Sequence, residues 1–372
     1  MKIAQVAPLY ESVPPKLYGG TERVVSYLTD ELVGMGHDVT LFASGDSTTS
    51  ARLVPCCDKA LRLDSRCVDP LAHHIVMLER VLQRAHDFDV IHFHCDYLHF
   101  PLTTRHATAS VTTLHGRLDL PDLVPLYREF GSVPVISISD AQREPLPWLN
   151  WQRTIYHGLP GDLYQFRPEP GKYLAFLGRT SPEKGLDRAI EIAKRTGIEL
   201  RIAAKVDRVD QQYFGEVIQP LLKHPLIQFI GEINDAEKCA FLGGALALLV
   251  PVNWPEPFGL VMIEAMACGT PVIAFRRGSI PEIVNDGESG FIVDDLDGAT
   301  QAVQKALSLD RKKCRRAFDR RFTAARMAQN YLETYRQLTS RERAGLCESK
   351  ENKLWMTSSV SKIGTTSSQP HL

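Results

Sequence analysis

The sequence predicts an α/β protein built from two doubly wound domains that face each other across a cleft. Its 372 residues are long for one hydrophobic core, which favours two domains. Short runs of strand-forming residues alternate with amphipathic helical patterns, as expected of parallel sheets covered by helices. The alternation ends before a segment rich in Gly and Pro and restarts at Tyr173, which indicates a second unit of the same kind.

The first unit begins with a strand, a helix and a second strand. Lys2–Pro8 is a short apolar run of the kind found in buried parallel strands. Thr21 is the expected N-cap of a helix whose apolar face carries Val24, Val25, Leu28 and Leu32. Gly34 and Gly36 end this helix. The strands expected after it are Val39–Ala43, Val90–His94, Val111–Leu114 and Val135–Ile138.

The second unit repeats this order. Its first strand, Tyr173–Leu177, precedes an amphipathic helix that carries Leu186, Ala189, Ile190 and Ala193. A helix is expected near Gly259–Ala267. The remaining strands are expected near Leu200–Ala203, Ile227–Ile230, Leu246–Pro251 and Val272–Phe275.

These patterns divide the chain into five segments. We expect an N-terminal domain over residues 1–157, a linker over 158–172 and a C-terminal domain over 173–310. Residues 311–344 have a helical pattern and are expected to cross back to the N-terminal domain. Residues 345–372 are rich in Ser and Thr with little periodicity, which predicts a disordered tail.

Composition excludes several classes of protein. The 43 Lys and Arg residues nearly balance the 44 Asp and Glu residues, so no global charge attracts nucleic acid. The eight cysteines include no C-x-x-C pair, which argues against a zinc site or a disulfide framework. No apolar run approaches the ~20 residues of a membrane helix, and the start does not resemble a signal peptide. We therefore expect a cytoplasmic protein.

Two cations stand where the first strand of the second unit ends. Arg179 leaves that strand, and Lys184 is expected to open the following helix. In doubly wound sheets, ligands bind beyond the carboxyl ends of the strands. Arg179 and Lys184 would therefore point into the cleft and neutralise a diphosphate, although solvated surface cations are the alternative. Lys205, just after the next strand, is a weaker candidate for contact with a nucleotide.

A second candidate element surrounds a short helix. Pro257 suits the first turn of that helix, and the amides of Phe258, Gly259 and Leu260 are placed to face phosphates. Glu256 and Glu264 lie eight residues apart, so they reach different parts of one long ligand. Glu264 is set among apolar residues and needs a polar partner such as a sugar hydroxyl, unless it is an exposed helical Glu.

The first unit contributes weaker signals. Gly19 and Gly20 permit close approach of a phosphate or a sugar, but a tight turn would explain the pair equally well. His115 ends a strand before Gly116, which favours a role in the site over a structural one. His92 and His94 share one strand face, so a metal site is conceivable, but no carboxylate or Cys pattern supports it.

Together these residues resemble a known family. Gly19-Gly20-Thr21-Glu22, with Gly36-His37-Asp38-Val39 downstream, is similar to the N-terminal signature of retaining glycosyltransferases of family 4. Gly178-Arg179, Lys184-Gly185, the pair Glu256 and Glu264, and Gly269-Thr270-Pro271-Val272 resemble its C-terminal domain. The resemblance covers Met1 to about Leu338. It is closest to the branch that resembles the avilamycin-pathway enzyme. No single motif is specific, but the combination is.

The resemblance implies a GT-B fold, retention of anomeric configuration and no metal. By matching positions, Arg179 and Lys184 would bind the donor diphosphate, Glu264 the ribose and Glu256 the transferred sugar. Gly20 would lie against the diphosphate and the sugar, and His115 would contact the sugar. The base would rest near Gly231-Glu232-Ile233 and be recognised mainly by backbone, so UDP-sugars are favoured only because they are common among relatives.

The expected reaction is transfer of a hexosyl group to an unidentified acceptor hydroxyl, on a glycan, a lipid-linked compound or a small molecule. Spacing singles out no carboxylate nucleophile, so we expect front-face attack in which the leaving diphosphate helps to deprotonate the acceptor. The alternatives are a nucleotide-sugar epimerase, a sugar phosphorylase and a non-catalytic binding module. The basic segment Arg311–Arg321 also suggests weak docking at the inner face of a membrane, with a solvated helix face as the alternative.

Overall fold

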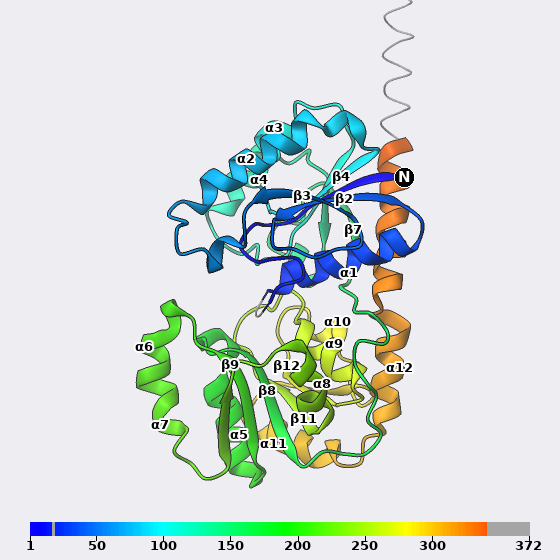
Figure 1. The fold of residues 1–372 in the computed structure, drawn as a ribbon. Helices are drawn as coiled ribbons and strands as arrows, with labels where there is room; N and C mark the ends of the chain where they lie inside the picture. The colour runs from blue at the N-terminus through cyan, green and yellow to red at the C-terminus, as the bar shows by residue number, and fades with distance from the viewer. Residues whose placement is uncertain (17–18, 341–372) are drawn as a thin grey trace, which may run out of the picture.

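The computed structural model describes residues 1–16 and 19–340, which form two α/β domains stacked one above the other (Figure 1). The predicted tail, residues 345–372, lies outside the described residues. Each domain is built on an all-parallel sheet with helices on its faces. The predicted two-domain α/β architecture is therefore confirmed.

The N-terminal sheet has seven strands in the order β3-β2-β1-β4-β5-β6-β7. Its central strands are buried on both faces because helices cover them, and the polar residues that they carry, such as Gln5, His92 and Thr113, are buried with the apolar ones. The strands are β1 (Lys2–Val6), β2 (Asp38–Ser44), β3 (Arg52–Cys57), β4 (Val90–Phe93), β5 (Ser110–Thr113), β6 (Val135–Ser137) and β7 (Trp151–Thr154). The helices are α1 (Gly20–Gly34), α2 (Pro70–Gln83), α3 (Phe100–Thr103) and α4 (Leu123–Glu129).

The C-terminal sheet has six strands in the order β10-β9-β8-β11-β12-β13. They are β8 (Tyr173–Arg179), β9 (Leu200–Lys205), β10 (Ile227–Gly231), β11 (Ala245–Val250), β12 (Val272–Phe275) and β13 (Gly290–Val293). The main helices are α5 (Leu186–Thr196), α8 (Asp235–Gly243), α9 (Leu260–Ala267), α10 (Ile280–Ile283), α11 (Leu296–Ala306) and α12 (Arg311–Arg321). Short helical segments from α6 (Gln211–Tyr213) to α7 (Gln219–Leu221) lie between β9 and β10.

Several local expectations were wrong. Helix α1 begins at Gly20, so Thr21 lies in its first turn and Gly19 is the N-cap. The edge strands β3, β7 and β13 were not predicted, nor were helices such as α2, α8 and α11. Pro55 interrupts β3, and every residue of β7 is only partly buried, so neither strand has the apolar run that marks the central strands.

The chain returns to its first domain at the C-terminus (Figure 1). Helix α12 packs on α9, and a second helix over 324–340 then places Tyr331 and Tyr335 in the core of the N-terminal domain. The chain is not helical between these two helices, where Leu159 exchanges backbone hydrogen bonds with Phe322 and Ala324. A Cβ on Gly158 would lie 2.3 Å from the carbonyl oxygen of Thr323. The two segments that connect the domains therefore pack so closely that position 158 requires glycine.

Part of the basic segment Arg311–Arg321 is structural, because three of its arginines donate to backbone carbonyls. Arg311 is only 4% exposed and donates to the carbonyl oxygens of Arg167, Gly243 and Ala245 and to Thr270. Arg315 and Arg321 also donate to backbone carbonyls. The segment's exposed cations are Lys312, Lys313, Arg316 and Arg320. None of the helices described is long and apolar enough to cross a membrane.

Candidate active site

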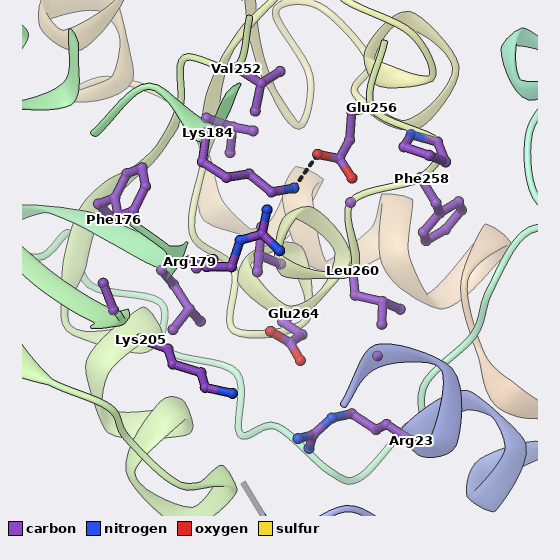
Figure 2. A pocket seen from close by; sticks show the side chains of 18 of the residues that line it. Arg23, Phe176, Arg179, Lys184, Lys205, Val252, Glu256, Phe258, Leu260 and Glu264 are labelled. Atoms are coloured by element: carbon purple, nitrogen blue, oxygen red, sulfur yellow. Dashed lines mark hydrogen bonds and ion pairs between the residues drawn. The ribbon is translucent and has the colours of Figure 1, made fainter. Parts of the chain in front are cut away.

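A pocket of about 420 Å³ lies between the two domains, and Figure 2 shows residues of the C-terminal domain that line it, together with Arg23 of the N-terminal domain. The residues predicted to be catalytic or to bind the donor all line this pocket, whereas Gly231, His92 and His94 do not. The domains are in contact around it. Ser139 of the first donates to the carbonyl of Pro257 in the second at 2.6 Å, and Glu282 accepts the backbone N–H groups of Asp140 and Ala141, each at 2.7 Å.

Three cations come from the carboxyl ends of β8 and β9. Arg179 and Lys205 are register partners on the two strands, so they lie side by side. Arg179 is paired with Glu183, and its Nε lies 3.2 Å from Asp210. Lys184 does not open α5 as predicted. It ends a 3-10 turn, and Gly185, at φ 69°, precedes the helix. Position 185 requires glycine because a Cβ there would lie 2.2 Å from the carbonyl oxygen of Pro251.

The N-terminus of α9 faces the same pocket. Gly259 is the N-cap in the left-handed region, φ 81°, and no side chain caps the helix, so its first amides are available to a ligand. Pro257 precedes this N-cap and does not lie in the first turn as predicted. Phe258 and Leu260 flank Gly259 and also line the pocket (Figure 2).

Two carboxylates belong to this element: Glu256 precedes the N-cap, and Glu264 lies within α9. Glu256 Oε2 accepts from Lys184 Nζ at 2.5 Å and from Trp254 Nε1 at 3.0 Å. Glu264 is 2% exposed, and its Oε1 accepts from Lys238 Nζ at 3.1 Å. Glu264 Oε2 is buried and has no hydrogen-bond partner among the described residues. A buried carboxylate oxygen without a donor is costly, and a ligand hydroxyl would satisfy it.

The remaining predicted residues complete the walls. Glu232 and Ile233 follow β10 on the C-terminal side, and Gly19 and Gly20 open α1 on the N-terminal side. A Cβ on Gly19 would meet Pro15 at 2.7 Å, so packing restricts that position. A Cβ on Gly20 would meet only Leu260, at an ordinary 3.5 Å, so protein packing does not require glycine there.

The histidines form a cluster in which His92, His94 and His157 are buried, whereas His115 is partly exposed and lines the pocket. His115 Nε2 lies 2.9 Å from His94 Nδ1, and the His115 ring stacks on His157 with centroids 5.3 Å apart. Burial lowers the pKa of His115 to about 3, so the ring is neutral at physiological pH. The ring nitrogens of His92 bond Tyr335 and Thr113. Across the described ranges, no three His, Cys, Asp or Glu side chains are grouped to hold a metal ion.

Several pocket residues were not predicted from the sequence, among them Arg23 and Trp254. Arg23 of α1 is 5% exposed and pairs with Asp235 of α8 across the domain boundary. The sequence around Arg23, including Val24 and Val25, did not indicate this ion pair, because Asp235 lies in the other domain. The Trp254 ring lies 4.8 Å from Lys184 Nζ and bonds Glu256, a position that its local sequence did not indicate.

Comparisons with known proteins cover both domains. Residues 18–158 match the model described as Glycosyltransferase Family 4, and residues 165–321 match Glycosyl transferases group 1. Glycogen synthase of Mycobacterium tuberculosis is 27% identical over 90% of this chain and 95% of its own. Phosphatidyl-myo-inositol mannosyltransferase of Mycolicibacterium smegmatis is 26% identical over 82% of this chain and 84% of its own.

Solved structures agree on the fold. AviGT4, a glycosyltransferase involved in avilamycin A biosynthesis, superimposes with a TM-score of 0.73 and 26% identity, covering 91% of this chain and 98% of its own. HepE of Anabaena, crystallised with UDP and glucose, has a TM-score of 0.71 and 21% identity, covering 91% of this chain and all of its own.

Proposed function

The chain is a glycosyltransferase of the GT-B fold, group 1 and family 4-like, and on that premise we propose that it transfers a hexosyl group from a nucleotide-sugar to an acceptor hydroxyl with retention. A UDP-sugar is the favoured donor, and HepE, crystallised with UDP-glucose, supports that choice by likeness of fold. The acceptor is a glycan, a lipid-linked compound or a small molecule.

The observation that carries the proposal is the convergence of positive groups on one face of the pocket. Arg179, Lys184 and Lys205 line it together with the uncapped N-terminus of α9 (Figure 2). Fixed cations and helix amides are the groups that hold a diphosphate and stabilise its charge as the sugar leaves. In this arrangement they would supply the neutralisation that a metal ion supplies elsewhere, so we propose metal-independent transfer.

The carboxylates fit sugar recognition. Glu256 lies beside Lys184, so it would hold hydroxyls of the transferred sugar next to the diphosphate. Glu264 keeps one buried oxygen unpaired among the described residues, which suits a ribose hydroxyl. His115, neutral and in the N-terminal wall, would contact the donor sugar from the opposite side.

The proposed mechanism is front-face substitution. The glycosidic C–O bond to the diphosphate breaks as the acceptor oxygen attacks from the same face, and the acceptor proton passes to a diphosphate oxygen. Arg179 and Lys184 would stabilise the charge on the leaving group. Removal of one such contact costs roughly 3 kcal/mol of transition-state stabilisation in comparable sites.

The test combines donor binding with product analysis in EDTA. A thermal-shift screen against UDP-, GDP- and ADP-sugars should give a selective rise in melting temperature, since ligands that bind the native state stabilise it. Arg179→Ala should lose turnover. Arg276→Ala is the matched control, because Arg276 pairs with Asp294 on the surface.

Each alternative predicts a distinct result. Altered nucleotide-sugar formed without an acceptor would indicate an epimerase, and dependence on inorganic phosphate would indicate a phosphorylase. Activity that requires an added divalent cation would overturn metal independence. No shift with any nucleotide-sugar at millimolar concentration, or full turnover in Arg179→Ala, would overturn the proposed donor site.

A further inference from the structure

A buried chain of hydrogen bonds joins the pocket to the C-terminal helix over 324–340. His115 Nε2 lies 2.9 Å from His94 Nδ1, and His94 Nε2 lies 2.8 Å from Gln5 Oε1. Gln5 Nε2 donates to the hydroxyl of Tyr335 at 3.1 Å, and that hydroxyl lies 2.7 Å from His92 Nδ1. Gln5, His92, His94 and Tyr335 are all 0–1% exposed. No water is therefore needed to complete the chain.

The amide of Gln5 sets the direction of every bond toward the pocket. Its oxygen only accepts, so His94 Nε2 must carry the proton that it donates to Gln5. Because His94 is neutral, its Nδ1 is then bare and must accept from His115 Nε2–H. His115 is neutral as well, so its Nδ1 has no proton.

The other branch is consistent with this direction. Tyr335 accepts from Gln5, so its own proton is free to be donated to His92 Nδ1. His92 Nε2–H then donates to Thr113 Oγ1 at 2.7 Å. Each hydrogen bond of the chain thus pairs one donor with one acceptor, as a buried polar network requires.

The network ends at His115, which lines the pocket and carries an unpaired ring nitrogen. His115 Nδ1 is buried and has no hydrogen-bond partner among the described residues. An unpaired lone pair is tolerated in proteins better than an unpaired N–H donor, so this also favours the tautomer with Nδ1 bare. The bare Nδ1 suits the hydroxyl of a bound sugar, which can donate to it.

We propose that Tyr335 and Gln5 are positioning residues that act through His94 to hold His115 as the Nε2–H tautomer, with Nδ1 as a hydrogen-bond acceptor for the donor sugar. Tyr335 belongs to the helix that crosses from the second domain, so docking of this helix completes the site in the first. The consequence for catalysis rests on the proposed function, whereas the tautomer does not.

The experiment measures the tautomer directly in the full chain without ligand. Long-range ¹H–¹⁵N spectra of ¹⁵N-histidine protein, with His115→Gln for assignment, should show His115 protonated on Nε2. Tyr335→Phe removes the hydroxyl that Gln5 Nε2 requires, which frees the amide to rotate. We expect a second tautomer of His115 and a fall in kcat of about 10-fold.

Tyr331→Phe is the matched control. Tyr331 lies one turn earlier on the same helix, is equally buried and also loses one hydroxyl, but it bonds Thr113, beyond His92 and off the path to His115. It should leave the tautomer and kcat unchanged. If Tyr335→Phe does not fold, Gln5→Met removes the acceptor of His94 and should shift the tautomer likewise.

Three results would overturn the proposal: a proton on Nδ1 of His115 in the wild type, no change in Tyr335→Phe, or equal changes in both tyrosine variants. The last would indicate general loosening of the helix. A correct tautomer in a protein that transfers no sugar would count against the proposed function alone, because the spectrum is recorded without donor.

Discussion

Lys184 Nζ and Glu256 Oε2 lie 2.5 Å apart and join the loop after β8 to the loop before α9. Trp254 donates to the same oxygen at 3.0 Å. Glu256 is therefore held through one oxygen while the other remains for a ligand. Under the proposed function, this pairing would place a carboxylate for sugar hydroxyls directly beside a cation for the diphosphate.

Glu256→Gln should lower kcat/KM for the nucleotide-sugar about 100-fold, because the neutral amide no longer pairs with Lys184 or accepts as strongly from sugar hydroxyls. Steady-state kinetics with a radiolabelled donor would measure this. Trp254→Phe keeps the ring but removes Nε1–H, so a smaller decrease is expected. A Glu256→Gln enzyme with wild-type kcat/KM would contradict the assignment.

Glu264→Gln should weaken nucleotide binding about 10-fold, since a neutral amide oxygen accepts less strongly from ribose hydroxyls than a carboxylate oxygen does. Titration calorimetry with the nucleoside diphosphate alone would show the change. Glu199→Gln is the control, because Glu199 pairs with Arg201 at the opposite end of the sheet. Equal affinities in wild type and Glu264→Gln would refute a ribose-binding role.

Titration of Glu22 should make the folded chain less stable at pH 7 and above than at pH 4.5. Burial raises the pKa of its carboxyl from 4.5 to about 7 in the folded chain. Between these values the folded chain retains a proton that the unfolded chain has released, so stability falls as pH rises from 4.5 to about 7 and stays lower above it. The loss is on the order of 3 kcal/mol, from 1.36 kcal/mol per pKa unit.

Urea unfolding at pH 5 and pH 8 would measure this effect in wild type and in Glu22→Gln. All other titrating groups are shared, so the difference between the two proteins isolates Glu22. The variant should lose less stability between the two pH values than wild type does. Parallel pH profiles would show that Glu22 does not titrate in this range.

Arg311→Met should lower the free energy of unfolding by about 3 kcal/mol, because it leaves buried carbonyl oxygens without the donors that Arg311 supplies. Chemical denaturation would measure the change. Arg316→Ala, at an exposed position of the same helix, should change stability by less than about 0.5 kcal/mol. A stable Arg311→Met variant would show that other groups satisfy these carbonyls.

The sequence by itself determined the parts whose cause is local. Central strands such as β11 and β12 are apolar throughout because both of their faces are covered, so they were predictable. Arg179 and Lys205 follow strands, and parallel strands end on one edge, so their meeting in one pocket was predictable as well. Edge strands such as β7 carry a mixed pattern and were missed.

Tertiary structure alone decided the pairings between residues far apart in the chain. In the sequence, Arg311 and Arg23 look like ordinary helical cations. In the structure, Arg311 donates to several backbone carbonyl oxygens, and Arg23 forms an ion pair across the domain boundary. Gln5 and Tyr335 are 330 residues apart, yet their hydrogen bond sets the direction of the network that reaches His115. Periodicity records only whether a position is buried; the partner that satisfies a buried polar group depends on how distant segments pack.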